Sequence, residues 1–362
     1  MESVFSPPRY YRGINVISEM GKVCSLFGKR AVLIGGHKAF GAAKEKVVVA
    51  LTESGIEVVD ALWYGGECTW NNIDSVAAKV KELNVDFVVG IGGGKAIDTS
   101  KAVAFRTGVA IVTVPTIAAT CAPVTPLSII HTAEGFYLEN TLDSALPVAI
   151  FADTDVIANG PSQLLFAGMG DTLAKWYEIR ATTSRIPKTS WTIGAVSLAK
   201  ACYDVIVEFG GDAKIAVENN ESTFPLEQIV DSIIWHAGMC SILGGDKCRG
   251  AAAHAVYFGF TNIDEAHKRY HGELVGYGNL CLLELEGRPE EEIISAIKLA
   301  KSIGVPITLD EIGKMTEADI ELVAKVATAS NEMKYMPVTV DEAMTVKAIY
   351  AIDQKGKTLT NN

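Results

Sequence analysis

Short apolar runs alternate with helical patterns along the first part of the chain, and this alternation restricts the fold more than any other feature. Four runs have the length and composition of buried strands: Ala31–Ile34, Ile56–Trp63, Phe87–Ile91 and Val109–Val114. A helical pattern follows the cap candidates Asn71 and Asn72. Strands that alternate with helices form a mostly parallel sheet with right-handed crossovers. We therefore expect an α/β domain.

The pattern changes near Asn159-Gly160-Pro161, after which strand-like runs nearly vanish and Ala-, Leu-, Glu- and Lys-rich segments take over. Before that point, Ser128–Thr132 and Phe136–Leu138 predict a hairpin added to the sheet, and Val148–Phe151 predicts its last strand. A chain of 362 residues exceeds the size of a single core, about 250–300 residues. We expect an α/β domain over residues 1–159 and an all-α domain over residues 160–362.

Composition excludes several classes of protein. The net charge of −11 argues against a nucleic-acid partner, which requires a basic surface. No apolar run reaches the roughly 18–20 residues of a membrane helix, and none near the start has the form of a signal peptide. The 7 cysteines lack a Cys-x-x-Cys pair, which favours reduced thiols and a cytoplasmic location.

A glycine cluster, Gly92-Gly93-Gly94, lies between a predicted strand and a predicted helix. Such a loop lets the backbone approach a pyrophosphate at a helix N-terminus. Its spacing is neither G-x-G-x-x-G nor that of a P-loop, so a tight structural turn is an equal alternative. The charges that follow, Lys95, Asp98 and Lys101, either face the ligand or form a solvated helix face. The loop that starts at Thr116 follows the next strand and is expected at the same end of the sheet.

Histidines and one aspartate in the second half form a candidate metal site. His267 and His271 are four residues apart, which places them on one face if the segment is a single helix. The small residues before His254 allow close packing against a neighbouring helix. With Asp171, these imidazoles suit a divalent metal, and three protein ligands leave a position open for a substrate. Taken singly, each histidine has an ordinary core or surface role as its alternative.

Five segments together resemble the iron-containing alcohol dehydrogenase superfamily, in its glycerol dehydrogenase-like branch, and parts of two of them, TIAATCA and GDTLAKW, are more similar to the hydroxycarboxylate dehydrogenase relatives that reduce 2-oxo acids. The resemblance rests on GIGGGKAIDTSKA, VPTIAATCAPVTPLS, GMGDTLAKWYE, AAAHAV and AHKRYHGELVGYG, which begin at Gly90, Val114, Gly168, Ala251 and Ala266. It implies a dehydroquinate synthase-like fold, with a Rossmann-like nucleotide-binding domain, a helical metal-binding domain and a homo-oligomeric state. The implied metal ligands are Asp171, His254 and His271. The expected cofactor contacts are His37, Gly93, Gly94, Lys95, Asp98, Thr116, Ala119, Thr125, Leu127 and His131.

Departures from the family pattern guide the prediction of metal and substrate. Lys175 stands where iron-dependent members commonly have a fourth ligand, which favours Zn²⁺ and leaves Fe²⁺ or another divalent metal as alternatives. Cys121 stands where glycerol dehydrogenases usually have Asp, which disfavours glycerol. Lys175 lies one helical turn after Asp171, where its ammonium could attract a substrate carboxylate; an ion pair with Asp171 or an outward position is the alternative.

We therefore predict hydride transfer between NADP or NAD and a small alcohol or carbonyl substrate, with a 2-hydroxy acid and 2-oxo acid pair first and glycerol as the alternative. His37 and Lys38 stand where a carboxylate often selects NAD, so NADP is expected to be tolerated. The catalytic candidates are Lys175, Cys121 as a substrate contact, and His267 as a proton relay or an orienting residue. Lower-ranked alternatives are a glycerol-1-phosphate dehydrogenase or 3-dehydroquinate synthase, and a nucleotide-binding homologue without turnover.

Overall fold

The computed structural model describes residues 7, 9–245, 248 and 250–360, and the chain divides into two compact units. The first unit comprises Met1–Pro161 and Ala216–Gly238, and the second comprises Ser162–Ile215 and Met239–Asn362. The chain therefore returns to the first unit after its first passage through the second. Among the described residues, none of the helices combines the length and the apolar composition that a membrane-spanning helix requires.

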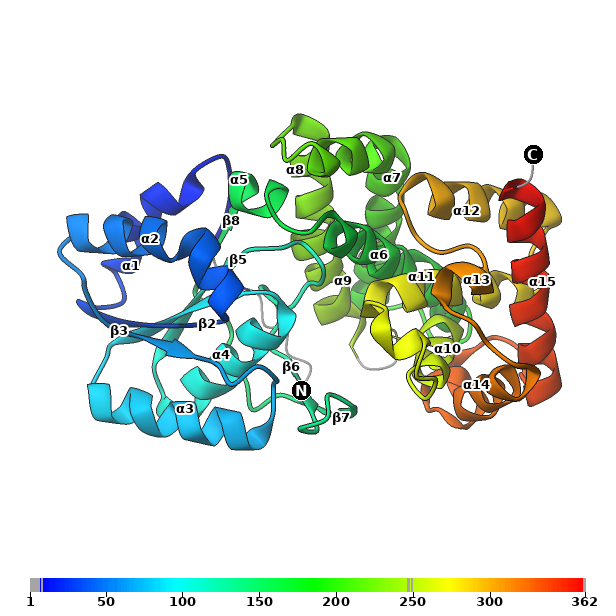
Figure 1. Cartoon of the computed structure of the whole chain (residues 1–362), viewed down its shortest axis with the longest axis horizontal. Helices are drawn as coiled ribbons and strands as arrows, with labels where there is room; N and C mark the ends of the chain where they lie inside the picture. Colours follow the sequence, from blue (N-terminus) through cyan, green and yellow to red (C-terminus); the bar gives the residue numbers. More distant parts are fainter. Residues whose placement is uncertain (1–6, 8, 246–247, 249, 361–362) are drawn as a thin grey trace. The chain divides into compact units, whose positions relative to one another are not determined.

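A six-stranded parallel sheet forms the centre of the first unit (Figure 1). Its strands, in spatial order, are β1 (Tyr10–Gly13), β8 (Ala149–Asp153), β5 (Ala110–Pro115), β4 (Phe87–Gly92), β2 (Arg30–Gly35) and β3 (Glu57–Trp63). The five strands predicted for this sheet are confirmed, and their ends differ from the predicted ends by at most two residues. Strand β1 was not predicted, because its sequence YYRG is short and only half-buried against β8.

Helices cover both faces of this sheet, and successive strand residues pack alternately against one face and the other. Leu33 and Val89 pack with residues of α1 (Met20–Cys24) and α2 (His37–Glu53). Their neighbours Val32 and Val88 pack with residues of α3 (Trp70–Leu83) and α4 (Gly94–Thr107). The continuous apolar runs in the sequence follow from this arrangement, because a strand buried on both faces has no polar side.

Two local predictions in the first unit are wrong. The cap of α3 is Thr69, whose side chain accepts the N–H of Asn72, so the helix begins before Asn71 and Asn72. The predicted hairpin exists as β6 (Ser128–His131) and β7 (Tyr137–Thr141), but it forms a separate two-stranded sheet. Strand β8, which follows the hairpin in the chain, pairs with β5 and β1, whereas β6 and β7 pair only with each other.

The remaining elements of the first unit are short. They comprise 3-10 turn Val16–Glu19, α5 (Thr154–Ala158), α8 (Phe224–Asp231) and a π-helical turn, Ser232–His236. Helix α7 (Ser190–Glu218) enters this unit at its end, and α9 (Ala237–Gly244) leaves it at its start.

The second unit is helical in its described residues, which confirms the prediction of an all-α C-terminal region. Besides most of α7 and α9, it contains α6 (Ser162–Thr183), α10 (Ala252–Phe260), α11 (His271–Leu285), α12 (Glu290–Ser302), α13 (Leu309–Ile312), α14 (Glu317–Ala329) and α15 (Glu342–Thr360). Two 3-10 turns, Ala266–Lys268 and Glu332–Tyr335, complete it. Helices α6, α10 and α11 pack together at its centre (Figure 1).

Candidate active site

Glycines set the distance between the helices that carry the metal-ligand candidates. A Cβ atom added at Gly272 of α11 would lie 1.8 Å from the carbonyl oxygen of Ala167 on α6. A Cβ atom at Gly278 would lie 2.4 Å from the carbonyl oxygen of Ala253 on α10. Backbones that approach this closely leave no room for larger residues. The expectation that the small residues before His254 allow close helix packing is confirmed.

This packing brings Asp171 of α6, His254 of α10 and His271 of α11 together. The Oδ1 atom of Asp171 lies 3.6 Å from Nε2 of His254 and 3.5 Å from Nε2 of His271. One ligand atom from each residue lies within 4.8 Å of the other two. The three side chains thus present one carboxylate oxygen and two imidazole nitrogens to a common point.

The donor set and its hydrogen bonding fit a divalent cation. The buried Oδ1 atom of Asp171 accepts no hydrogen bond, although a buried carboxylate oxygen requires a partner. Burial acts to raise the pKa of Asp171, but Lys175 and the two imidazoles outweigh it and hold that pKa well below its usual range. An ionised carboxylate with two imidazoles is a donor set typical of Zn²⁺ and suits other divalent transition metals.

Glu178 is a residue of this site that the sequence analysis missed. It is fully buried on α6, two turns after Asp171, and its Oε2 atom lies 2.7 Å from Nδ1 of His254. Its Oε1 atom accepts the backbone N–H groups of Ala251 (2.7 Å) and His254 (3.0 Å) at the start of α10. Burial opposes ionisation of Glu178, but His254 lowers its pKa overall. The seven-residue spacing from Asp171, which returns to the same helix face, is the signal that could have identified it.

The same contact affects His254. Burial alone would lower the pKa of this imidazole, but Glu178 and Asp171 raise it to about 9. An imidazole with that pKa would carry a proton at neutral pH unless a metal were bound. A metal at this position would take the place of that proton.

Lys175 lies where its i,i+4 spacing predicts. Its Nζ atom is 3.6 Å from Oδ1 of Asp171, and the side chain is buried. The outward position considered for Lys175 is therefore wrong, whereas the ion pair with Asp171 that was considered beside it is present. Its ammonium lies beside the same oxygen that faces His254 and His271, so a cationic side chain borders the candidate metal centre.

The helical pairing predicted for His267 and His271 is wrong. His267 belongs to the 3-10 turn Ala266–Lys268, whereas His271 is the first residue of α11. Between them, Arg269 and Tyr270 have extended backbone conformations, so no single helix carries both histidines. The side chain of His267 lies outside the described part of the structure, and its role as a proton relay stays a prediction.

In the first unit, the glycine loop and the loop at Thr116 lie together. The N–H of Thr116 donates to the carbonyl of Gly92 (3.1 Å), and a Cβ atom at Gly93 would lie 2.6 Å from the side chain of Ile117. Gly94 is the first residue of α4, so the N–H groups at the start of that helix, which have no partner within the helix, lie at these loops. The expectation that both loops lie at one end of the sheet is confirmed.

Two predicted cofactor contacts share a partner that the sequence analysis did not single out. Lys95 pairs with Glu67, and Nδ1 of His131 lies 3.4 Å from the other carboxylate oxygen of Glu67. Glu67 also lies near the hairpin turn, because a Cβ atom at Gly135 would be 3.5 Å from its Oε2. A carboxylate from the loop before α3 thus connects the glycine loop to β6.

Two of the three charged residues that follow the glycine loop are buried and do not form a solvated helix face. Lys95 is exposed, but Asp98 and Lys101 are both buried and pair with each other at 2.8 Å. Among the other predicted contacts, Thr116 and Thr125 are buried, whereas Ala119 and Leu127 are partly accessible. The solvated helix face considered for Asp98 and Lys101 is therefore wrong.

His37 and Cys121 lie at separate places in the first unit. His37 is the first residue of α2, is exposed, and stacks on Trp63 with ring centroids 5.6 Å apart. Cys121 is partly buried next to Gly238 of the same unit, where an added Cβ atom would lie 3.6 Å from the Cβ of Cys121. These contacts do not decide whether His37 contacts the cofactor or Cys121 contacts the substrate, so both roles stay predictions.

Comparison with known proteins agrees with this architecture. A family model described as iron-containing alcohol dehydrogenase matches residues 7–154. A glycerol dehydrogenase from Escherichia coli is 36% identical over 97% of this chain and 96% of its own. Hydroxycarboxylate dehydrogenase A, also from Escherichia coli, is 34% identical over 86% of this chain and 85% of its own.

A crystal structure has the same fold over the same extent. That of a probable glycerol dehydrogenase from Sinorhizobium meliloti 1021 superposes with a TM-score of 0.87 at 32% sequence identity. The match covers 99% of this chain and 100% of the other. Both the α/β and the helical regions are therefore shared.

Proposed function

The chain belongs to the iron-containing alcohol dehydrogenase family, among its glycerol dehydrogenase-like members, and from that premise we propose that it interconverts glycerol and dihydroxyacetone with a nicotinamide cofactor and a divalent metal. It is an oxidoreductase of this family. The observation that carries the proposal is the convergence of Asp171, His254 and His271. The sequence prediction ranked 2-hydroxy acids first, but the full-length similarity to glycerol dehydrogenase favours the glycerol alternative.

The residues of the second unit would hold the metal. Asp171, His254 and His271 supply the ligand atoms, and Glu178 orients His254 so that its Nε2 faces the ligand point. When bound, the metal supplies Lewis-acid polarisation of the substrate oxygen, and the nicotinamide supplies or accepts the hydride. Three protein ligands leave room for a substrate oxygen. We favour Zn²⁺ because Lys175 occupies the position of the fourth ligand.

The loops of the first unit would bind the nucleotide. The start of α4 at Gly94 offers N–H groups and the positive end of a helix dipole to a pyrophosphate. Lys95 adds an exposed ammonium beside that start. At the end of β2, His37 and Lys38 are exposed and place no carboxylate against a 2′-phosphate. The proposal therefore includes use of both NAD and NADP.

A second candidate substrate class has its own support. Lys175 is a buried ammonium 3.6 Å from the carboxylate oxygen of Asp171, and it would attract a substrate carboxylate. Hydroxycarboxylate dehydrogenase A is among the relatives. This observation favours reduction of 2-oxo acids as the second candidate.

A substrate panel after metal analysis tests the proposal. The protein is loaded with Zn²⁺ and assayed for oxidation of glycerol and for reduction of dihydroxyacetone and short 2-oxo acids, with each nicotinamide cofactor. We expect the highest kcat/KM with the glycerol and dihydroxyacetone pair. A kcat/KM for a 2-oxo acid that exceeds the value for dihydroxyacetone would replace the first candidate by the second. Absence of turnover with metal and nucleotide both bound would overturn the enzymatic proposal.

A further inference from the structure

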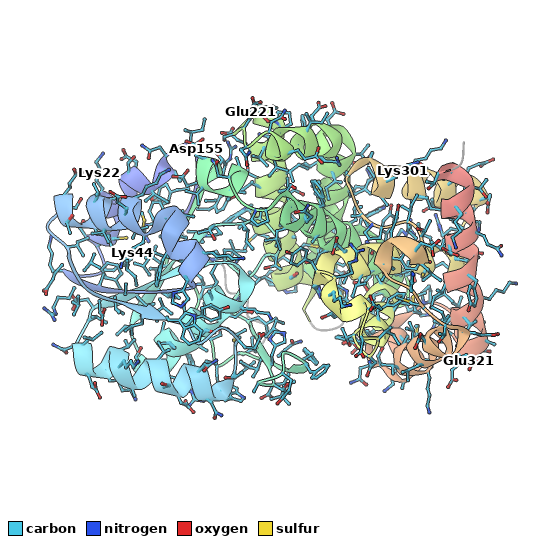
Figure 2. All side chains as sticks on the ribbon, in the orientation of Figure 1. Lys22, Lys44, Asp155, Glu221, Lys301 and Glu321 are labelled. Carbon is cyan, nitrogen blue, oxygen red and sulfur yellow. The ribbon has the colours of Figure 1, made fainter. Side chains whose placement is uncertain are left out.

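Lys101 is a buried lysine in the unit that carries the nucleotide-binding loops. Lys22, Lys44 and Lys301 are exposed, as lysines usually are (Figure 2). Lys101, by contrast, has no exposed surface and extends from α4 into the interior. An ammonium without access to water requires polar partners that replace its hydration, because an unpaired buried charge is very costly.

Its partners are backbone carbonyls of one segment. The Nζ atom donates to the carbonyl oxygens of Ala122 (2.9 Å), Thr125 (3.0 Å) and Leu127. The carboxylate of Asp98, one turn earlier on α4, lies 2.8 Å from the same Nζ atom. One ammonium therefore gathers three carbonyls that the chain places within six residues.

The sequence of this segment explains why it needs such a donor. Two of the three carbonyls precede Pro123 and Pro126, and proline has no N–H with which to form a ladder or a turn. Some backbone carbonyls of the segment therefore have no backbone N–H to accept, and a buried side chain supplies the missing donors. Thr113 contributes in the same way, because its Oγ1 donates to the carbonyl of Pro123 (3.0 Å).

Asp98 ties this arrangement to the hairpin. Its Oδ2 atom accepts the N–H of Ile129 (3.1 Å), and its backbone carbonyl accepts Oγ of Ser128 (2.9 Å). Burial raises the pKa of Asp98 and the nearby ammonium of Lys101 opposes that rise, so the two charges depend on each other. The pair Asp98 and Lys101 joins α4 to both ends of the proline-containing segment.

We propose that Lys101 is a positioning residue for cofactor binding, which holds the segment from Ala122 to Leu127 in the conformation that contacts the nicotinamide nucleotide. The inference rests on the proposed function, because it takes Thr125 and Leu127 as cofactor contacts. Lys101 itself has no surface exposed to a ligand, because α4 and this segment enclose it. Its effect is transmitted through the backbone carbonyls that it binds.

The variant Lys101→Ala tests this role in the full-length, metal-loaded protein. We expect the Kd for NADH or NADPH, measured by nicotinamide fluorescence, to rise about tenfold or more, because small displacements of contact groups have effects of this size. The Kd of the second unit for Zn²⁺ should stay within about twofold, and the KM for nucleotide should rise more than kcat falls. Propylammonium, which has the atoms that Lys101→Ala lacks, should restore nucleotide binding.

The exposed lysine variant Lys22→Ala is the matched control and should bind nucleotide as the parent protein does. A folded Lys101→Ala protein with unchanged nucleotide affinity would overturn the inference. An equal loss of Zn²⁺ affinity would also overturn it, because the residue would then support the fold in general. If Lys101→Ala does not fold, the Kd for NADH or NADPH is measured on Lys101→Arg instead. Its planar guanidinium keeps the charge but changes the donor geometry, so the Kd should again rise, and an unchanged Kd would overturn the inference.

The test also separates this inference from the proposed function. If the parent protein bound neither NADH nor NADPH, both the proposed function and the role of Lys101 would be overturned. A parent protein that binds nucleotide, together with a variant that binds it equally well, would overturn only the role of Lys101.

Discussion

The Oε2 atom of Glu178 lies 2.7 Å from Nδ1 of His254, and this contact determines which imidazole nitrogen faces the candidate metal centre. An ionised carboxylate only accepts hydrogen bonds, so Nδ1 carries a proton. When His254 is neutral, its Nε2 is then the free nitrogen, and this atom points toward Oδ1 of Asp171. Carboxylates that orient a ligand histidine in this way are common at metal sites.

The variant Glu178→Gln tests that relationship. The glutamine oxygen can still accept the backbone N–H groups at the start of α10, but its amide would donate to Nδ1 and favour the wrong tautomer. We expect the affinity for Zn²⁺ to fall by about 10–100-fold, measured by competition with a chromogenic chelator. Glu321→Gln, an exposed change on α14, is the control (Figure 2). Equal Zn²⁺ affinities for Glu178→Gln and the parent protein would contradict the orienting role.

Removal of the metal should affect both activity and stability. A chelator is expected to abolish turnover and to lower the melting temperature, because a ligand bound at 100 times its Kd stabilises the folded state by about 2.7 kcal/mol. Added Zn²⁺ should restore both. The variant Asp171→Asn removes one ligand charge and should show little change in melting temperature with chelator. A melting temperature of the parent protein that ignores the chelator would count against a metal centre at these residues.

Lys175→Met tests the second substrate class. The change keeps much of the side-chain length and removes the ammonium 3.6 Å from Asp171. We expect kcat/KM for 2-oxo acids to fall by about tenfold or more, since a charge-assisted hydrogen bond contributes about 1.5–3 kcal/mol. The kcat/KM for dihydroxyacetone, which is uncharged, should change much less. Parallel losses for both substrates would show that Lys175 does not select a carboxylate.

His37→Asp tests the proposed use of NADP. A carboxylate at the start of α2 would repel a 2′-phosphate and could accept the ribose 2′-OH of NAD. The ratio of kcat/KM for NADPH to that for NADH should therefore fall by about tenfold or more, as expected for a close like-charge contact of about 1.4 kcal/mol. An unchanged ratio would place the 2′ position of the nucleotide away from His37.

Gly272→Ala tests the close packing of α6 and α11. The added methyl group would lie 1.8 Å from the carbonyl oxygen of Ala167, so the helices must move apart. We expect the free energy of unfolding to fall by about 3 kcal/mol and the affinity for Zn²⁺ to weaken, because Asp171 and His271 lie on these helices. Gly211→Ala on α7 is the matched control. Nothing lies within 4 Å of its added Cβ, so a helical alanine there should be neutral or slightly stabilising.

Local sequence patterns were enough to predict five of the six strands of the large sheet, the helical second half and the i,i+4 relation of Lys175 to Asp171. These features depend on local periodicity, which a single chain segment expresses without its neighbours. Local patterns also misled. The spacing of His267 and His271 suggested one helix, but the extended conformations of Arg269 and Tyr270 separate them.

Contacts between distant residues, by contrast, follow from the packing of the helices and loops. Asp171, His254 and His271 are separated by long stretches of chain, and backbone contact at Gly272 and Gly278 brings their helices together. The burial of Lys101 could likewise not be predicted from the sequence, because three of its four partners are backbone carbonyls, which every residue carries. Side-chain type reveals what a residue can bind, whereas the packing of helices and loops determines what lies within its reach.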